Sequence, residues 1–163
     1  MNTKNVLKII VGLSILIVMS AAELNAQILT KDKETMKYQI TIINKYFGRT
    51  NNRVIITEDS LAYERKVYKG NNGKIARLLT REEKKSLENF LKDFPLNELE
   101  ESYYTNAVKD GTQMTFVISI NDNIKEIFIG NVYQEDLGKL VALVVPMLPE
   151  DFIQYKKELI YPY

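Results

Sequence analysis

Residues 70–95, GNNGKIARLLTREEKKSLENFLKDFP, contain the change from strand to helix that decides the fold class. The first four residues are Gly and Asn only and accept the positive φ angles of a tight hairpin turn, so Lys74–Leu79 is predicted to be a returning strand. Thr80 and Glu83 are spaced as a capping box, which begins a helix, and Pro95 ends that helix. Apolar residues recur at i, i+3, i+4 and i+7 in between and form one buried stripe: Leu87, Phe90, Leu91 and Phe94.

Three more strands are predicted before this stretch. Met36–Ile42 alternates between apolar and polar residues, which indicates a strand with one face in the core and one in water. Gly48–Asn52 is rich in turn residues, Arg53–Glu58 is rich in β-branched residues, and Leu61–Lys69 follows a tight Asp-Ser connection. Together with Lys74–Leu79, these segments predict a four-strand antiparallel meander.

A second β region is predicted after the helix. Thr112–Ile120 and Ile124–Gly130 alternate on either side of the turn Asn121-Asp122-Asn123, which predicts a hairpin. Between Pro95 and this hairpin, a short helical turn that packs under the sheet is predicted from three residues: Leu96, Leu99 and Tyr103.

Two further helices are predicted at the end of the sequence. Apolar residues recur at helical spacing from Gln134 onward, and Pro146 is placed to bend or end that helix. Pro149, followed by two carboxylates, begins another helix that continues toward Ile160. Strands joined by short turns, with the helices grouped, indicate the α+β class: an antiparallel sheet, made of a four-strand meander plus a hairpin, packed by helices on one face.

The N-terminal segment has the pattern of a secretory signal peptide, residues 1–26. Lys4 and Lys8 precede the uncharged stretch Ile9–Ala22, whose 14 residues are fewer than the roughly 20 that span a bilayer as a helix. Export followed by cleavage is therefore expected. The alternative is an uncleaved N-terminal anchor, with Lys8 reaching toward the membrane surface.

Cleavage is expected between Ala26 and Gln27, which leaves a protein in the periplasm or outside the cell without stable membrane insertion. The chain has no Cys, so a lipid-anchored form is excluded. Residues 27–35 mix charged and polar residues without periodicity and are expected to be a flexible arm. Residues 36–163 are expected to form a single domain.

The composition limits the chemistry that this domain can perform. The chain has no Cys, His or Trp, so disulfides, the common catalytic triads and zinc sites built on imidazole or thiolate are excluded. We therefore predict a non-enzymatic protein with no metal and no cofactor. Its hydrophobic fraction of 45% is typical of globular proteins, and its stability is expected to come from ordinary burial.

A net charge of +1 conceals two oppositely charged halves. Residues 27–85 contain 14 Lys and Arg against 7 Asp and Glu, whereas residues 86–163 contain 6 against 13. Either the halves interleave in the fold and their charges become neighbours, or the surface is dipolar and steers a charged partner. The basic residues are dispersed and the total is near neutral, so no nucleic-acid partner is expected.

Tyrosine is the best candidate for partner contacts, because it combines a large contact area with a polar tip and is enriched at interfaces. Four Tyr lie beside predicted element ends, where a partner can reach them: Tyr103, Tyr104, Tyr161 and Tyr163. A different chemistry is suggested by the carboxylates of Glu98, Glu100, Glu101 and Asp110. Two of them facing each other in a cleft would supply a general acid and a general base.

The predicted layout resembles that of small exported proteins of Gram-negative bacteria whose families have no assigned function. The segments that carry this resemblance are Thr80-Arg81-Glu82-Glu83 at a helix start, Phe94-Pro95-Leu96 at its end, Asp110-Gly111-Thr112 at a hairpin start, and Leu137–Leu148. The order of meander, helix, hairpin and helix is also similar to that of the emfourins, which are small metalloprotease inhibitors. No diagnostic emfourin residue matches, so the resemblance implies a binding module and assigns no site residue.

The leading hypothesis is an exported, non-enzymatic module that binds another envelope or extracellular protein, or an envelope component, through strand faces, loops and exposed Tyr. Two alternatives stay open. One is a small hydrolase or lyase that uses carboxylates as acid and base, and a pocket in which Glu98 and Asp110 converge would favour it. The other is a structural envelope protein that self-associates through an exposed sheet edge.

Overall fold

A computed structural model describes residues 36–46, 49–66, 72–105, 113–149 and 155–157. All of them belong to one structural unit, Met36–Tyr163. The predicted signal peptide and arm lie outside the described residues, as does most of the predicted C-terminal helix.

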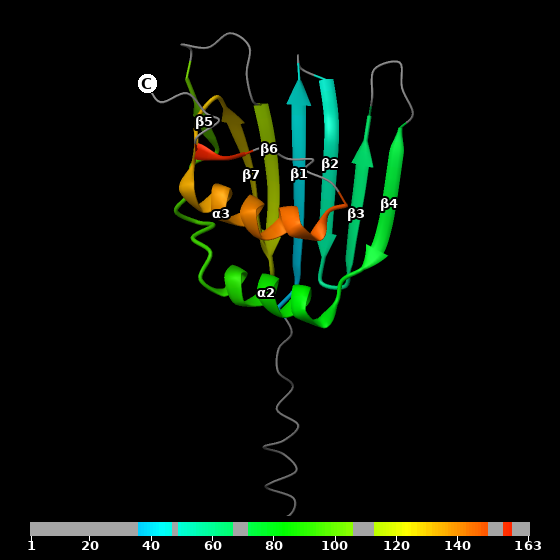
Figure 1. The fold of residues 1–163 in the computed structure, drawn as a ribbon. Helices are drawn as coiled ribbons and strands as arrows, with labels where there is room; N and C mark the ends of the chain where they lie inside the picture. Colours follow the sequence, from blue (N-terminus) through cyan, green and yellow to red (C-terminus); the bar gives the residue numbers. More distant parts are fainter. Residues whose placement is uncertain (1–35, 47–48, 67–71, 106–112, 150–154, 158–163) are drawn as a thin grey trace, which may run out of the picture. The chain divides into compact units, whose positions relative to one another are not determined.

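A seven-stranded sheet organises these residues, in the order β4-β3-β2-β1-β6-β7-β5. Neighbouring strands are antiparallel except for β5 and β7, which run parallel. The predicted α+β class is confirmed: β1 to β4 form the meander, and β1 pairs with β6 to join it to the β6–β7 hairpin (Figure 1). The strands are β1 Tyr38–Tyr46, β2 Arg49–Thr57, β3 Ser60–Arg65, β4 Gly73–Leu78, β5 Ser102–Tyr104, β6 Gln113–Ile120 and β7 Asn123–Gly130.

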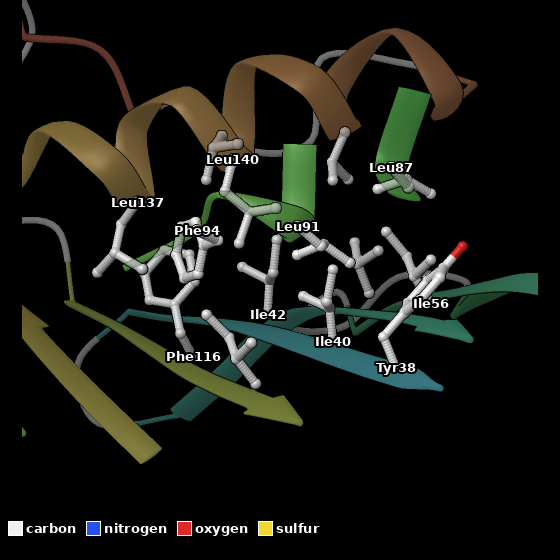
Figure 2. Close-up of a cluster of buried hydrophobic side chains, with 14 of the residues drawn as sticks. Tyr38, Ile40, Ile42, Ile56, Leu87, Leu91, Phe94, Phe116, Leu137 and Leu140 are labelled. Carbon is white, nitrogen blue, oxygen red and sulfur yellow. The ribbon is translucent and has the colours of Figure 1, made fainter. Parts of the chain in front are cut away.

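The core lies between one face of the sheet and the helices. In β1, Tyr38, Ile40 and Ile42 are buried while the residues between them are not, which is the predicted alternation. The register places Ile42 beside Phe116 of β6, so the apolar faces of the two strands coincide. Figure 2 shows these side chains pointing toward Leu87 and Leu91 of one helix and Leu137 and Leu140 of the other.

Helix α2, Arg81–Lys92, begins at the predicted capping box. The Thr80 hydroxyl accepts from the Glu83 N–H at 3.2 Å, and the Glu83 carboxylate accepts from the Thr80 N–H at 2.8 Å. Glu83 also accepts two hydrogen bonds from the Arg77 guanidinium, at 2.8 and 2.7 Å, and Arg77 donates a third to the Met147 carbonyl at 2.8 Å. Arg77 therefore joins the edge strand β4 to the start of α2 and to the 3₁₀ turn η1, Val145–Met147.

Helix α3, Glu135–Val144, covers the same face of the sheet and is held at its start by Tyr155. The Tyr155 hydroxyl accepts from the Gln134 N–H at 2.7 Å and donates to the Val132 carbonyl at 3.2 Å. The ring of Tyr133 stacks on that of Tyr155, with 5.1 Å between the ring centroids. Pro146 follows α3 as predicted and lies in η1.

Three details differ from the sequence prediction. The predicted turn Gly48–Asn52 is wrong, because β2 already begins at Arg49 and Asn52 pairs with Asn44 of β1. The predicted strand Leu61–Lys69 is shorter than expected among the described residues, since β3 ends at Arg65. The predicted helical turn through Tyr103 is also wrong at that residue, which lies in β5 and pairs with Ile129 of β7.

Candidate functional site

The sheet has a second face, turned away from α2 and α3, and no described helix covers it (Figure 1). Because side chains alternate along a strand, the residues between the buried ones belong to this face. We call it the open sheet face. From β2 to β5 its large apolar residues are Ile43, Ile55, Tyr104, Val117, Ile124 and Phe128, and Leu78 lies on the same face at the edge strand β4.

Four apolar residues of the open sheet face lie in two neighbouring cross-strand rows, each with a threonine between its apolar members, and we call these four residues the apolar band: Ile43, Ile55, Val117 and Phe128. Ile55 and Val117 flank Thr41 in one cross-strand row, because both pair with it in the register. In the next row, Thr115 lies between Ile43 and Phe128 and is buried. The four aliphatic and aromatic members of these two rows are half-buried, so they offer a flat surface of partly covered apolar side chains.

Two aromatic residues, Phe128 and Tyr104, lie at one end of this band. Gly130 is buried, and a Cβ atom at this position would lie 3.1 Å from the Phe128 ring and 3.1 Å from the Tyr104 Cβ. A side chain at Gly130 would therefore crowd the Phe128 ring and the paired residue Tyr104. Tyr104 is 61% exposed, and Ile124, near the beginning of β7, is 69% exposed. Both side chains are available to a partner.

The charges on the open sheet face are unevenly placed. Lys45 and Arg53 flank the apolar band on the side of β1 and β2, and both are half-buried. The Arg53 Nε is buried and finds no hydrogen-bond partner among the described residues. On β3 and β4 the Glu64 carboxylate lies 3.2 Å from the Lys74 ammonium, so those two charges compensate each other. On β7 the face carries the exposed Glu126 instead. The open sheet face is thus positive on the meander side.

A groove of about 490 Å³ opens beside the face at the part of β7 that β5 does not pair with. Its lining includes Asn97, Glu101, Ile124 and Glu126. Lys125 fixes the wall of the groove, because its ammonium donates to the carbonyls of Leu96, Asn97 and Leu99. An ammonium bonded to three carbonyls holds the segment between α2 and β5 against the edge of β7.

The two Tyr of the predicted pair in β5 are placed differently. Tyr103 points to the core side, where it is half-buried and packs against the buried cluster, and its hydroxyl accepts from the Glu100 N–H at 2.8 Å. Tyr104 points to the open sheet face. Tyr161 and Tyr163, the other predicted contact residues, lie outside the described residues.

The predicted carboxylate cluster does not form a described catalytic pair. Glu98 lines a neighbouring hollow of about 390 Å³ beside the end of α2, and Asp110 lies outside the described residues. Glu101 and Glu126 both line the larger groove, but both side chains are exposed to water. Within the described part of the chain, no group of three or more acidic residues is arranged to hold a metal ion.

The sequence prediction missed the apolar band itself. The alternation in Met36–Ile42 predicts a wet face, but Ile43, Ile55, Val117 and Phe128 come from four strands and are separated in sequence. The signal was present as an extra apolar residue in each strand at a position where the alternation calls for a polar one. Only the strand register brings these exceptions together.

Comparison with protein-family models finds no match for this chain, and comparison with curated proteins finds none either. Among the described residues, no helix has the length and apolar character needed to cross a bilayer.

Proposed function

We propose that the chain is an exported, non-enzymatic binding module that recognises another protein through its open sheet face. The observation that carries this proposal is the apolar band formed by Ile43, Ile55, Val117 and Phe128 on a face that no described helix covers. Apolar residues clustered on a protein surface and rimmed by polar ones often mark an interaction site.

The residues around the band indicate which chemical groups the partner's surface would carry. Tyr104 and Phe128 supply aromatic contact area, which is enriched at protein interfaces. Lys45 and Arg53 lie beside the band and give this side of the face a positive charge. A partner surface with apolar side chains at its centre and carboxylates on the side that meets β1 and β2 would complement the apolar band and the positive charges of Lys45 and Arg53.

The test uses the full chain, expressed with its own N-terminal segment. The protein is purified as the cell produces it, whether or not that segment has been cleaved. The protein is immobilised, exposed to an extract of the cell envelope, and the retained proteins are identified and then titrated individually. Ile55→Asp and Phe128→Asp each place a charge in the apolar band and are expected to weaken binding of a true partner by about tenfold or more. Binding is also expected to weaken with added salt, because Lys45 and Arg53 contribute charge.

Asn89→Asp is the matched control, because Asn89 is exposed on α2, on the side of the sheet opposite to the open sheet face. This variant should retain the same partner with unchanged affinity. Failure to retain any protein, or equal retention by the control and by both band variants, would remove the support for this function.

A further inference from the structure

The strand β4 forms one edge of the sheet and leaves a row of peptide groups without a strand partner among the described residues. Leu79 donates its N–H to the Asp59 carbonyl at 2.9 Å, which continues the β3–β4 ladder by one position. Antiparallel ladders alternate, so the peptide groups of Ile75 and Arg77 also face β3, whereas those of Lys74, Ala76 and Leu78 face outward.

The side chains of this edge are unusually apolar for an exposed strand. Leu78 is 75% exposed and Ile75 is 42% exposed, and Ala76 is exposed as well. Edge strands are ordinarily protected from pairing by charged residues that repel another strand. Here the two charges of β4 are compensated within the same chain, Lys74 by Glu64 at 3.2 Å and Arg77 by Glu83 at 2.7 Å. The usual protection is therefore weakened.

From this arrangement we propose that β4 pairs with β4 of a second copy of the chain, antiparallel and in register about Ala76. This register places Lys74 opposite the partner's Leu78 and Ala76 opposite the partner's Ala76. In this antiparallel register the peptide groups of Lys74, Ala76 and Leu78, which face away from β3, all lie opposite peptide groups of the partner strand that also face outward. The Leu78 carbonyl already accepts from the Arg77 guanidinium at 3.0 Å, and its second lone pair is free for the partner strand.

The facing side chains fit this register. No like charges oppose each other, since Lys74 meets Leu78 and Ile75 meets Arg77 across the pair. The aliphatic part of Lys74 can cover the exposed Leu78 while its ammonium remains bonded to Glu64. At the two-fold axis, Ala76 lies opposite the partner's Ala76, and the two methyl groups pack without a clash.

Pairing of this kind joins two seven-stranded sheets into one and keeps both open sheet faces on the same side. A six-residue edge buries less surface than the roughly 1,200–2,000 Å² of a stable interface, so a weak dimer that depends on protein concentration is expected. The inference stands independently of the proposed function, because the pairing is made by the backbone groups of the β4 edge and does not involve the apolar band.

The test is the molar mass of the purified full chain by analytical ultracentrifugation at concentrations from about 1 to 200 µM, where a weak dimer dissociates measurably. Ala76→Lys and Ala76→Glu each place two like charges opposite each other at the axis, so each variant alone should dimerise at least about tenfold more weakly. An equimolar mixture of the two should dimerise again, because Lys then faces Glu. Gln39→Lys and Gln39→Glu are the controls, since Gln39 is exposed on the same face but on the central strand β1.

Circular dichroism establishes that each variant is folded before its mass is compared. Loss of the dimer in both single variants and its recovery in the mixture would support pairing about Ala76. A monomer throughout the concentration range, a dimer that neither charge affects, or a mixture that stays monomeric would overturn the inference. A dimer weakened equally by the Gln39 variants would assign the contact to the open sheet face and would overturn it as well.

Discussion

Tyr38 and Tyr155 are two buried tyrosines in opposite hydrogen-bonding situations. Each is only 3% exposed. The Tyr38 hydroxyl has no hydrogen-bond partner among the described residues, whereas the Tyr155 hydroxyl bonds to the Gln134 N–H and to the Val132 carbonyl. Substitution by Phe removes the same atom at both positions. We predict that Tyr38→Phe stabilises the protein and that Tyr155→Phe destabilises it.

The size of each stability change follows from the hydrogen-bonding groups that lose their partner when the hydroxyl is removed. In Tyr155→Phe, the Gln134 N–H loses a 2.7 Å bond and the Val132 carbonyl loses a longer one at 3.2 Å. An unsatisfied buried group costs about 1–3 kcal/mol, so the free energy of unfolding should fall by about 2–3 kcal/mol. In Tyr38→Phe no partner is orphaned and the desolvation cost of the hydroxyl disappears, which should raise the free energy of unfolding by about 1 kcal/mol.

Urea titration of both variants, followed by far-ultraviolet circular dichroism, measures these free energies directly. Tyr104→Phe is the control, because its side chain is 61% exposed and its substitution should change little. The opposite signs are the critical result. If Tyr38→Phe lost stability as Tyr155→Phe does, the Tyr38 hydroxyl would have to make a bond in the folded protein, and the reasoning from its isolation would be wrong.

The same pair predicts the behaviour at high pH. Burial raises the pKa of Tyr38 to about 12, and burial is also the main cause that raises the pKa of Tyr155 to about 12, from an ordinary value of 10.0. The folded state therefore holds these protons more tightly than the unfolded state. The stability linked to them is fully present below pH 10 and is lost as the pH rises toward 12. Each Phe variant should lose less stability over this interval than the unmodified protein.

Three other substitutions test the contacts that hold the fold together. Hydrogen bonds from Arg77 lower the pKa of Glu83 from 4.5 to about 2, so this carboxylate stabilises the folded state above pH 4.5 and the effect is lost as the pH falls toward 2. Glu83→Gln should lower the free energy of unfolding by about 2 kcal/mol at pH 7 and make that free energy depend less on pH below 4.5. Glu82→Gln, at an exposed position of the same helical turn, should do neither. A Cβ at Gly138 would lie 2.0 Å from the Tyr133 hydroxyl oxygen, so Gly138→Ala should displace Tyr133 from Tyr155. We expect it to lower the thermal midpoint despite the gain of about 1 kcal/mol in helix propensity, and Gly138→Ala combined with Tyr133→Ala should recover that gain. Lys125→Met removes three hydrogen bonds to carbonyls and should cost about 2–3 kcal/mol in a urea titration, whereas Lys92→Met, at an exposed position, is expected to be neutral.

The parts of the fold that the sequence predicts correctly are those whose cause is local. The Thr80–Glu83 capping box depends on residues three apart, and both of its hydrogen bonds form. The β6–β7 turn depends on residues that accept positive φ, and Asn121 adopts a φ of 53° there. The alternation in β1 depends only on the pleat of the strand, and its buried residues are the predicted ones.

The errors occur where the cause is distant in sequence. β5 consists of three residues, Ser102–Tyr104, and its conformation is fixed by parallel pairing with Phe128–Gly130 of β7. Three residues carry too little periodicity to distinguish a strand from a helical turn, so the sequence places Tyr103 in the wrong element. Similarly, the Asn residues after Arg49 favour a turn by composition, but pairing with β1 places them in β2.

The candidate site shows the same division. Tyr104 was predicted as a contact residue from its type and position, and it does lie exposed beside the apolar band. Ile43, Ile55, Val117 and Phe128 were not predicted, because one apolar residue on the wet side of a single strand is unremarkable. They become a surface only when four strands align, and that alignment depends on the long-range pairing of β1 with β6.

The same β1–β6 pairing decides how the two oppositely charged halves of the chain are arranged. Because β1 and β6 are neighbours at the middle of the sheet, β1 to β4 occupy one side of it and β5 to β7 the other, and the strands of the two halves do not interleave. Several ion pairs accordingly join two members of the same half: Lys74 with Glu64, Arg77 with Glu83, Lys84 with Asp59, and Lys139 with Glu135 and Asp136. Interleaved strands would have placed opposite charges side by side and cancelled them. On the strands, the excess of positive charge therefore stays on the side of β1 to β4, whereas β5 to β7 carry only Lys125 and Glu126. A charged partner that docks on the open sheet face would accordingly favour one orientation.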